Sequence, residues 1–224
     1  MGTRGAYGFR VDGIDKITYN HFDSYPESLG KAMIRYVASK TPDQLAEVAR
    51  RLVLVDVDDK ATPELVERYK KRFSNTDVGD QDDSSWYCLL REAQGEPSAW
   101  DAVPGLPTLD HMIDGHEFLA NSLFCEWAYI INVDDGVLEV YKGFNKDPDA
   151  PGRYAALTRE RPSEYRGVRL LTTVALAFAE QTGSVPVWDT ADRRVTNAVR
   201  AAVVEQRIAD LTASWTGATK DDDD

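Results

Sequence analysis

The chain of 224 residues is 42% hydrophobic and 29% charged, which is typical of a folded globular protein and argues against disorder throughout. Its 38 acidic and 26 basic residues give a formal net charge of -12. Proteins that bind nucleic acid gain affinity by neutralising phosphates with Lys and Arg, so this charge argues against a nucleic-acid partner.

The hydropathy pattern predicts a cytoplasmic protein. The residues after Met1 have no apolar stretch of the kind found in signal peptides. No window approaches 18 consecutive apolar residues, so we expect no membrane partner. Cys88 and Cys125 lack the spacing of metal ligands and are expected to be buried thiols. The three histidines also lack metal-site spacing, and we predict neither a metal nor another cofactor.

The first predicted element is a β-hairpin. Residues 5–11 and 14–22 alternate between apolar and polar side chains on either side of Asp12-Gly13, a dipeptide typical of tight turns. Gly5 and Gly8 lie inside the first strand, where glycine often marks the close approach of another backbone. We therefore expect a crowded or ligand-lined first strand.

A helix is predicted next, with Pro26 at a suitable first position. Apolar residues follow it at the spacing of one helix face: Leu29, Met33, Ile34 and Val37. Thr41 and Thr62 each precede a proline and predict the N-caps of two further helices, over 43–52 and 64–73, the first with a capping box. The short apolar run over 53–57 either extends the helix before it or forms a strand.

The middle of the chain carries weaker signals. An acidic loop is expected over 75–85, followed by a short helix over 86–94 that ends at Gly95. Residues 97–115 contain three prolines and irregular apolar spacing, so we expect a loop with broken helical turns.

A second hairpin is predicted from 127–133 and 137–144, joined by Asp134-Asp135-Gly136. The apolar run over 168–180 and the long periodic segment over 189–215 are both expected to be helices. Strands and helices thus succeed one another without a linker, which predicts a single α+β domain over 1–219. The acidic end of the chain, 220–224, is expected to be a disordered tail.

The polar residues between the first hairpin and the following helix predict a site. Backbone N–H groups at a helix start attract anions, and Asn20, His21, Asp23 and Tyr25 lie at this junction. His21 is the candidate general base or acid, and Asp23 would orient it or hold a substrate amine. The alternative is structural: Asp23 or Ser24 caps the helix and Asn20 supports a turn.

Arg4 and Arg10 are candidate ligand-binding residues on the first strand. A buried arginine can bind a carboxylate through two parallel hydrogen bonds, so Arg10 is expected to hold an acidic group of a ligand. The alternative is an ion pair with one of the chain's many carboxylates.

The N-terminal segment resembles a family of small proteins from bacteria, phages and fungi that share the pattern RGxxGFR, then DKxTYNHFDSYPxxLG and EWAYxIxxDxxxLEVY. In this chain the pattern covers Arg4–Arg10, Asp15–Gly30 and Glu126–Tyr141. The resemblance implies a shared fold and carries no established activity.

The layout is more remotely similar to N-terminal nucleophile hydrolases, in which a nucleophile begins a strand and an Asn or Asp follows the hairpin. That likeness implies a layered sandwich and assigns Thr3, Asn20 and Asp23 to the site. Removal of Met1 would expose Gly2, which has no nucleophile, so Thr3 would require a further cleavage. The sequence thus favours a small-ligand site or hydrolysis of an amide-like bond at this junction. The alternative is a non-catalytic phage or bacterial accessory protein that acts through protein contacts.

Overall fold

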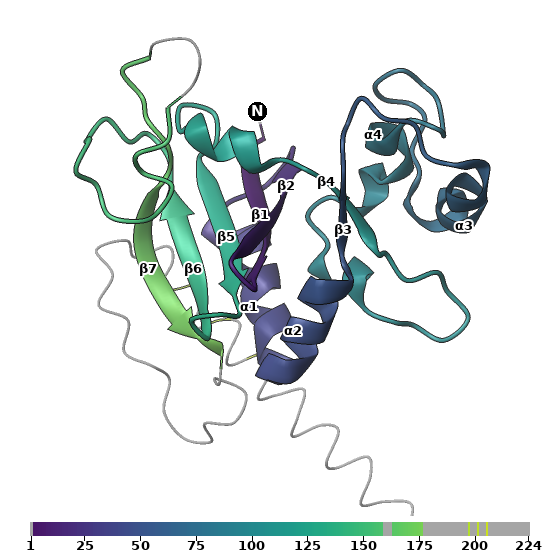
Figure 1. Ribbon diagram of the computed structural model, residues 1–224, viewed down its shortest axis with the longest axis horizontal. Coiled ribbons are helices and arrows are strands. Elements are labelled where there is room, and N and C mark those ends of the chain that lie inside the picture. Colours follow the sequence, from purple (N-terminus) through teal and green to yellow (C-terminus); the bar gives the residue numbers. More distant parts are fainter. Residues whose placement is uncertain (1, 159–162, 177–196, 198–200, 202–204, 206–224) are drawn as a thin grey trace, which may run out of the picture.

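The computed structural model describes residues 2–158, 163–176, 197, 201 and 205 (Figure 1). Its centre is a mixed sheet of five strands in the order β2-β1-β5-β6-β7. β1 pairs in parallel with β5, and the other neighbours are antiparallel. The strands are β1 (Gly5–Val11), β2 (Ile14–Asn20), β5 (Trp127–Asn132), β6 (Val137–Lys142) and β7 (Arg169–Ala175). The predicted α+β class is confirmed.

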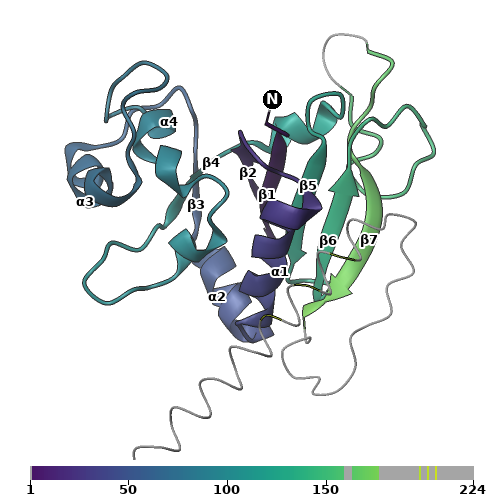
Figure 2. The ribbon, with the colours of Figure 1, turned by 180° about the vertical axis from the view of Figure 1, so that it is seen from behind.

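One face of the sheet packs against two helices. Side chains of a strand alternate between faces, so Tyr7, Phe9 and Val11 of β1 point to the same side. They pack there with buried residues of α1 (Lys31–Ala38) and α2 (Pro42–Arg51). Figure 2 shows α1 lying across this face of the sheet. The largest buried cluster of the described chain fills the space between these two layers and continues through Trp100 to Tyr69 and Phe73.

The opposite face of the sheet is covered by irregular segments. Ala6, Ile17 and Ile130 pack there against Tyr154, Val168 and a 3₁₀ turn over His116–Ala120. The two hairpin turns meet at one end of the sheet, since the Asp134 carboxylate accepts hydrogen bonds from the backbone N–H groups of Asp12 and Gly13, at 2.7 and 2.9 Å.

A smaller part of the molecule lies beside β2 (Figure 1). It contains a parallel pair of short strands, β3 (Val53–Val55) and β4 (His111–Ile113), with α3 (Pro63–Phe73) and α4 (Trp86–Leu89). Two 3₁₀ turns, Arg91–Ala93 and Pro97–Trp100, link α4 to β4. Trp100 stacks on Tyr7 with ring centroids 5.3 Å apart and thereby joins this part to the sheet.

Both predicted hairpins are confirmed, with strand ends one or two residues shorter than expected. The predicted N-caps are also confirmed: the Thr41 side chain accepts from Gln44 N in a full capping box, and that of Thr62 accepts from Leu65 N. The run at 53–57 takes its strand alternative as β3. The helix predicted from Pro26 opens with a π-helical turn over Pro26–Gly30 before α1.

The helix predicted over 168–180 is wrong in its described part, which forms β7. A short apolar run does not distinguish a buried helix from a strand, and Thr172, Thr173 and Val174 are β-branched residues that favour strands. β5 pairs with one edge of β6. Pairing with β7 satisfies the backbone N–H and carbonyl groups of the other edge. Sequence reasoning missed β4, whose partner lies more than fifty residues earlier in the chain.

The helix predicted over 189–215 lies largely outside the described residues, and the tail over 220–224 lies wholly outside them. The three described residues of that helix, Asn197, Ala201 and Glu205, are helical. None of the helices in the described part of the chain is long and apolar enough to cross a membrane. Cys88 and Cys125 are free and buried, as expected.

Candidate functional site

Strand alternation divides the predicted site residues between the two faces of the sheet. Asn20 lies directly opposite Gly5 of β1 and therefore shares the helix-covered face with Tyr7. Tyr19 lies opposite Ala6 and points to the other face. The Tyr19 hydroxyl is 2.8 Å from Nδ1 of His21, so His21 follows Tyr19 to that second side. Asn20 and His21 consequently face different surroundings.

Asn20 holds the turn that follows β2. Its Nδ2 donates to Oγ of Ser24 at 2.8 Å and to the Phe22 carbonyl. The backbone N–H of Ser24 donates to the Thr3 carbonyl at 3.0 Å, which ties the turn to the start of the chain. Asp23 has a left-handed backbone with a φ of 49°, a conformation that Asp tolerates better than most residues. The predicted turn role of Asn20 is confirmed.

The predicted helix cap is wrong. The residue in the N-cap position is Tyr25, and no side chain makes a capping hydrogen bond there. Instead the Asp23 carbonyl accepts from Leu29 N at 3.2 Å, and the Tyr25 carbonyl accepts the π-type bond from Gly30 N at 3.2 Å. The side chain of Asp23 is exposed and free of a capping role.

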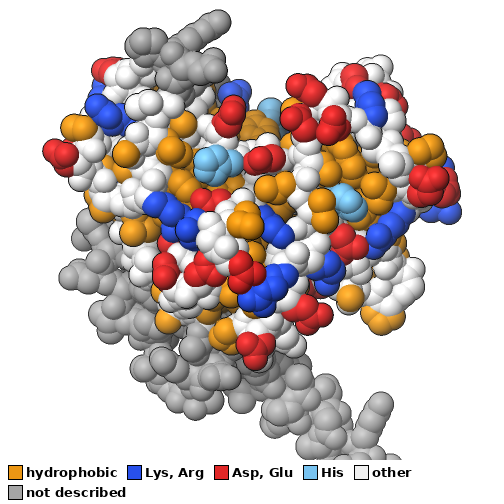
Figure 3. Space-filling view, viewed as in Figure 1, with side chains coloured by type: hydrophobic (Ala, Val, Ile, Leu, Met, Phe, Trp, Pro, Cys, Tyr) orange, Lys and Arg blue, Asp and Glu red, His pale blue; other side chains and the backbone are white. Residues whose placement is uncertain are grey.

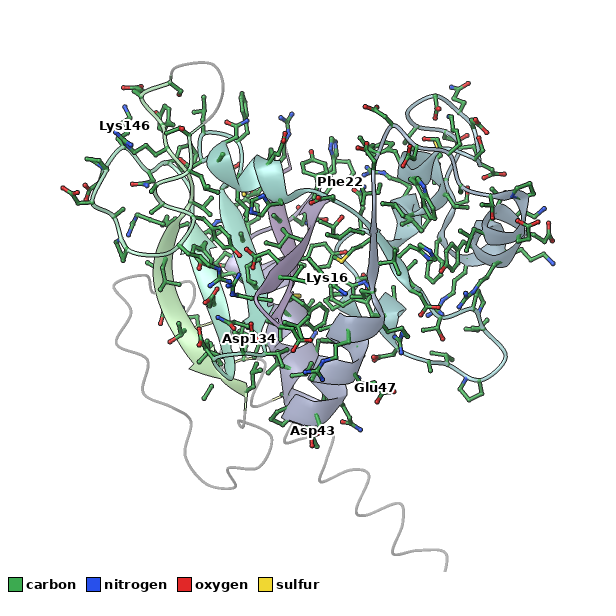
Figure 4. All side chains as sticks on the ribbon, viewed as in Figure 1. Lys16, Phe22, Asp43, Glu47, Asp134 and Lys146 are labelled. Atoms are coloured by element: carbon green, nitrogen blue, oxygen red, sulfur yellow. The ribbon has the colours of Figure 1, made fainter. Side chains whose placement is uncertain are left out.

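Asp23 and Asn20 line a cleft of about 880 Å³, here called the first cleft. Phe22 belongs to the same turn and is 54% exposed; Figure 4 places it between the sheet and the part that carries α3 and α4. Across the cleft lies the segment after α3, which contributes Asn75, Val78, Arg91, Glu92 and residues 94–96. The π-helical turn and α1 form its remaining wall.

The first cleft has charges of both signs. Its wall carries the cations Lys31, Arg35 and Arg91. Its carboxylates come from the turn, the helix start and the opposite segment: Asp23, Glu27, Glu92 and Glu96. Lys31 and Arg35 are one helical turn apart on α1, and both contact the carboxylate of Glu205. Such a lining suits a ligand that itself carries both a positive and a negative group.

Arg91 connects the two walls of the first cleft. Its guanidinium lies 5.0 Å from the ring centroid of Phe22 and 5.5 Å from that of Tyr87. Its NH1 donates to Oε1 of Gln94 at 2.5 Å. Together with Arg4 and with partial burial, Arg91 lowers the pKa of His21. Burial is the largest of these causes, and the imidazole is therefore held neutral at pH 7.

Arg10 lies far from this junction. It is the next-to-last residue of β1 and pairs with Asp15 at the closed end of the hairpin, whereas Asn20 pairs with Gly5 at the open end. Its NH1 is 3.0 Å from Oδ1 of Asp15, and Arg153 approaches the same oxygen at 3.6 Å. Arg10 lies five positions along β1 from Gly5, about 17 Å along the strand. The ion-pair alternative for Arg10 is therefore confirmed.

Arg4 and Tyr25 lie near the junction without lining the first cleft in the described part of the chain. The Arg4 guanidinium lies 5.6 Å from the ring centroid of Phe124. The Tyr25 carbonyl accepts from Ser28 N and Gly30 N and so shapes the π-helical turn. Both residues thus act on the junction from outside the cleft.

Thr3 is 1% exposed, and its buried hydroxyl has no hydrogen-bond partner in the described part of the chain. In this state the hydroxyl does not reach either the first cleft or the solvent. Among the described residues no group of three or more His, Cys, Asp or Glu side chains is placed to hold a metal ion.

Sequence reasoning missed Lys31, Arg35 and Arg91 as lining residues. The spacing of Lys31 and Arg35 signals one helix face, but nothing in the local sequence places Arg91 beside Phe22, almost seventy residues earlier. A comparison of the chain with known protein families, with curated proteins and with solved structures found no match.

Proposed function

We propose that the first cleft binds a small zwitterionic ligand of the amino-acid or short-peptide class. The observation that supports this proposal is the cleft's lining, which combines both charge signs with the apolar side chains of Phe22, Leu29 and Val78. Pockets for small molecules usually measure about 300–1,000 Å³, and the first cleft falls in that range. The proposal places the protein in the cytoplasm, where such ligands are abundant.

The charges suggest how such a ligand would lie. Lys31 and Arg35 stand on one helix and suit a carboxylate, in competition with Glu205. Asp23 lies on the turn that precedes the same helical segment, lines the same cleft and suits an ammonium group. An apolar side chain of the ligand would then pack against Phe22 and bury part of its exposed ring.

A thermal-shift assay tests this proposal with leucyl-glycine as the probe. At ten times its dissociation constant a ligand adds about 1.4 kcal/mol to stability, which raises the melting temperature of a chain this size by roughly 3–6 °C. The blocked analogue N-acetyl-leucinamide has no charges and should give no shift. Lys31→Gln and Asp23→Asn should each reduce the shift, while the distant Lys146→Gln should not. Equal shifts with both probes would contradict the proposal.

Hydrolysis of an amide-like bond is the catalytic extension of the same proposal. It would use Asp23 and Asn20 in the cleft, with His21 as the proton carrier after a change in its pairing with Tyr19. Release of free leucine from leucyl-glycine, abolished in Asp23→Asn, would support it. Intact-mass measurement of the native protein adds a second test, because only a chain that begins at Thr3 would have an N-terminal nucleophile.

An accessory role through protein contacts is the second candidate, and it is favoured by an exposed apolar patch. Leu123, Phe124 and Phe144 are 36%, 46% and 52% exposed. They lie on adjoining segments, since Phe144 N donates to the Ser122 carbonyl at 2.7 Å. A photo-crosslinking residue at Phe144 should capture a bacterial or phage protein partner, whereas the same residue at Asp43 on α2 should not. Equal capture at both positions would count against this role.

A further inference from the structure

A second cleft, of about 460 Å³, lies beside β2, where Thr18 and Tyr19 line it, and it shares Gln94 with the first cleft. The chain passes this edge after β4, where Gly115 N donates to the Ile17 carbonyl at 2.7 Å. Figure 3 shows a hollow between the sheet and the α3–α4 part, with hydrophobic side chains inside it and acidic side chains on its rim. This second cleft contains none of the residues expected to form the hydrolytic site.

Aromatic rings from three separate segments line the second cleft. Tyr19 comes from β2, Tyr87 from α4 and Phe118 from the 3₁₀ turn over His116–Ala120. Tyr19 and Phe118 meet edge to face, with ring centroids 4.9 Å apart and an angle of 89° between the planes. Val57 and Ile113 add aliphatic surface. The lining of the cleft therefore combines aromatic and aliphatic side chains.

The ionisable residues of the second cleft differ from those of the first. Asp114 and Glu117 line it, both exposed, and none of its described lining residues is Lys, Arg or His. Arg91 lies over the Tyr87 ring at 5.5 Å but lines the first cleft, so the tyrosine already takes part in one cation–π contact from that side. Arg4 is the other cation whose charge reaches Tyr19. Inside the cleft itself the fixed charges are negative.

Aromatic faces combined with carboxylates favour a particular class of ligand. A methylated ammonium ion has a positive charge spread over an apolar surface, so it gains from ring faces, from aliphatic contacts and from nearby carboxylates at once. A metal ion would gain little from the rings, and an anion would be repelled by Asp114 and Glu117. We propose that the second cleft binds a small organic ammonium ion with methyl groups on its nitrogen.

Choline and its neutral isostere 3,3-dimethylbutan-1-ol test this proposal on the full chain. The two molecules have nearly the same shape and differ in the charge at the branched centre. Titration followed by backbone amide NMR should show choline shifts at Tyr19, Gly115 and Phe118. Choline should bind at least about fivefold more tightly than the alcohol, as expected for an exposed cation–π site.

Substitutions separate the contribution of the carboxylates from that of the aromatic rings, and they distinguish the second cleft from the first. Glu117→Gln removes an exposed carboxylate and should weaken choline binding about threefold, and Tyr87→Leu should weaken it about fivefold. Glu47→Gln on α2 is the matched control and should have no effect. Lys31→Gln in the first cleft should also leave choline binding unchanged. The proposal is overturned if choline fails to bind, if the alcohol binds equally well, or if the shifts lie elsewhere.

Discussion

The Tyr19 hydroxyl lies 2.8 Å from Nδ1 of His21, two residues along the chain. This spacing is that of side chains on the same face of a strand, so the contact continues the alternation of β2 past its last residue. It turns the imidazole away from Asn20 and Asp23. The junction therefore presents a carboxylate to the first cleft and a neutral histidine to the opposite side.

The pKa of His21 should lie below 6.5 in the folded protein. Burial and the charges of Arg91 and Arg4 disfavour the imidazolium, and removing one of those charges in Arg91→Gln should raise the pKa toward its ordinary value. NMR titration of the His21 ring protons measures the pKa in the unmodified chain and in Arg91→Gln. Arg50→Gln, at the far end of the sheet, is the control. A pKa above 6.5 in the unmodified chain would contradict this account of the junction.

The lowered pKa of His21 makes the stability of the folded chain depend on pH. The unfolded chain binds a proton at His21 more readily than the folded chain does. The stabilising contribution of the neutral His21 side chain is therefore fully present above pH 6.5. That contribution should be lost as the pH falls from 6.5 through the lowered pKa of the folded state. Denaturant unfolding of the unmodified chain and of His21→Gln should therefore converge or cross within this window.

Lys16 closes the C-terminal end of α2 and should contribute to stability. Its Nζ donates to three backbone carbonyls, those of Ala49, Arg50 and Leu52, at 2.9, 3.2 and 2.5 Å. Lys16→Met would leave these acceptors without their charged donor, at a cost of about 1.5–3 kcal/mol. Urea unfolding measures this loss.

Lys146→Met provides the comparison for that experiment. Lys146 forms an exposed ion pair with Glu164, and such pairs contribute at most about 1 kcal/mol. Figure 4 labels both lysines, Lys16 on β2 at one edge of the sheet and Lys146 in the loop after β6, toward the other edge. Equal destabilisation by the two substitutions would show that Lys16 has no special role at the end of α2.

Gly8 permits the close pairing of β1 with β2. A Cβ atom at this position would lie 2.0 Å from the Lys16 carbonyl oxygen, which belongs to the backbone and cannot move without breaking the strand pair. We expect Gly8→Ala to destabilise the fold by at least about 3 kcal/mol. Gly136→Ala in the second turn has open space and only an unfavourable φ of 67°, so it should cost about 1–2 kcal/mol. Similar losses at both positions, measured by thermal unfolding, would contradict the packing argument.

Local signals in the sequence predicted much of this fold. The Asp12-Gly13 turn and the capping box at Thr41 each depend on chemistry within a few residues, and both are confirmed. The close backbone approach expected at the glycines of β1 is also confirmed, although the approaching carbonyls belong to Trp127 and Lys16. At the candidate junction, Asn20 and Asp23 line the first cleft, while the predicted site role of these residues stays a prediction.

The positions of Arg91, β7 and Arg10 depend on contacts that the local sequence pattern does not reveal. Arg91 comes to Phe22 because the segment after α4 folds back toward the hairpin, and no local pattern encodes that return. Residues 169–175 form β7 and not the predicted helix because they pair with the open edge of β6, which no local pattern reveals. Arg10 lies outside the junction because the hairpin register places it beside Asp15, at the opposite end of β1 from the Gly5–Asn20 pair.

Isothermal titration of leucyl-glycine is the decisive measurement of whether the first cleft binds a zwitterion through the positive and negative side chains that line it. We expect saturable binding to the unmodified chain, at least about fivefold weaker binding to Lys31→Gln and to Asp23→Asn, and no binding of N-acetyl-leucinamide. Equal affinity of all three chains for leucyl-glycine, or equal binding of the blocked analogue, would contradict this proposal.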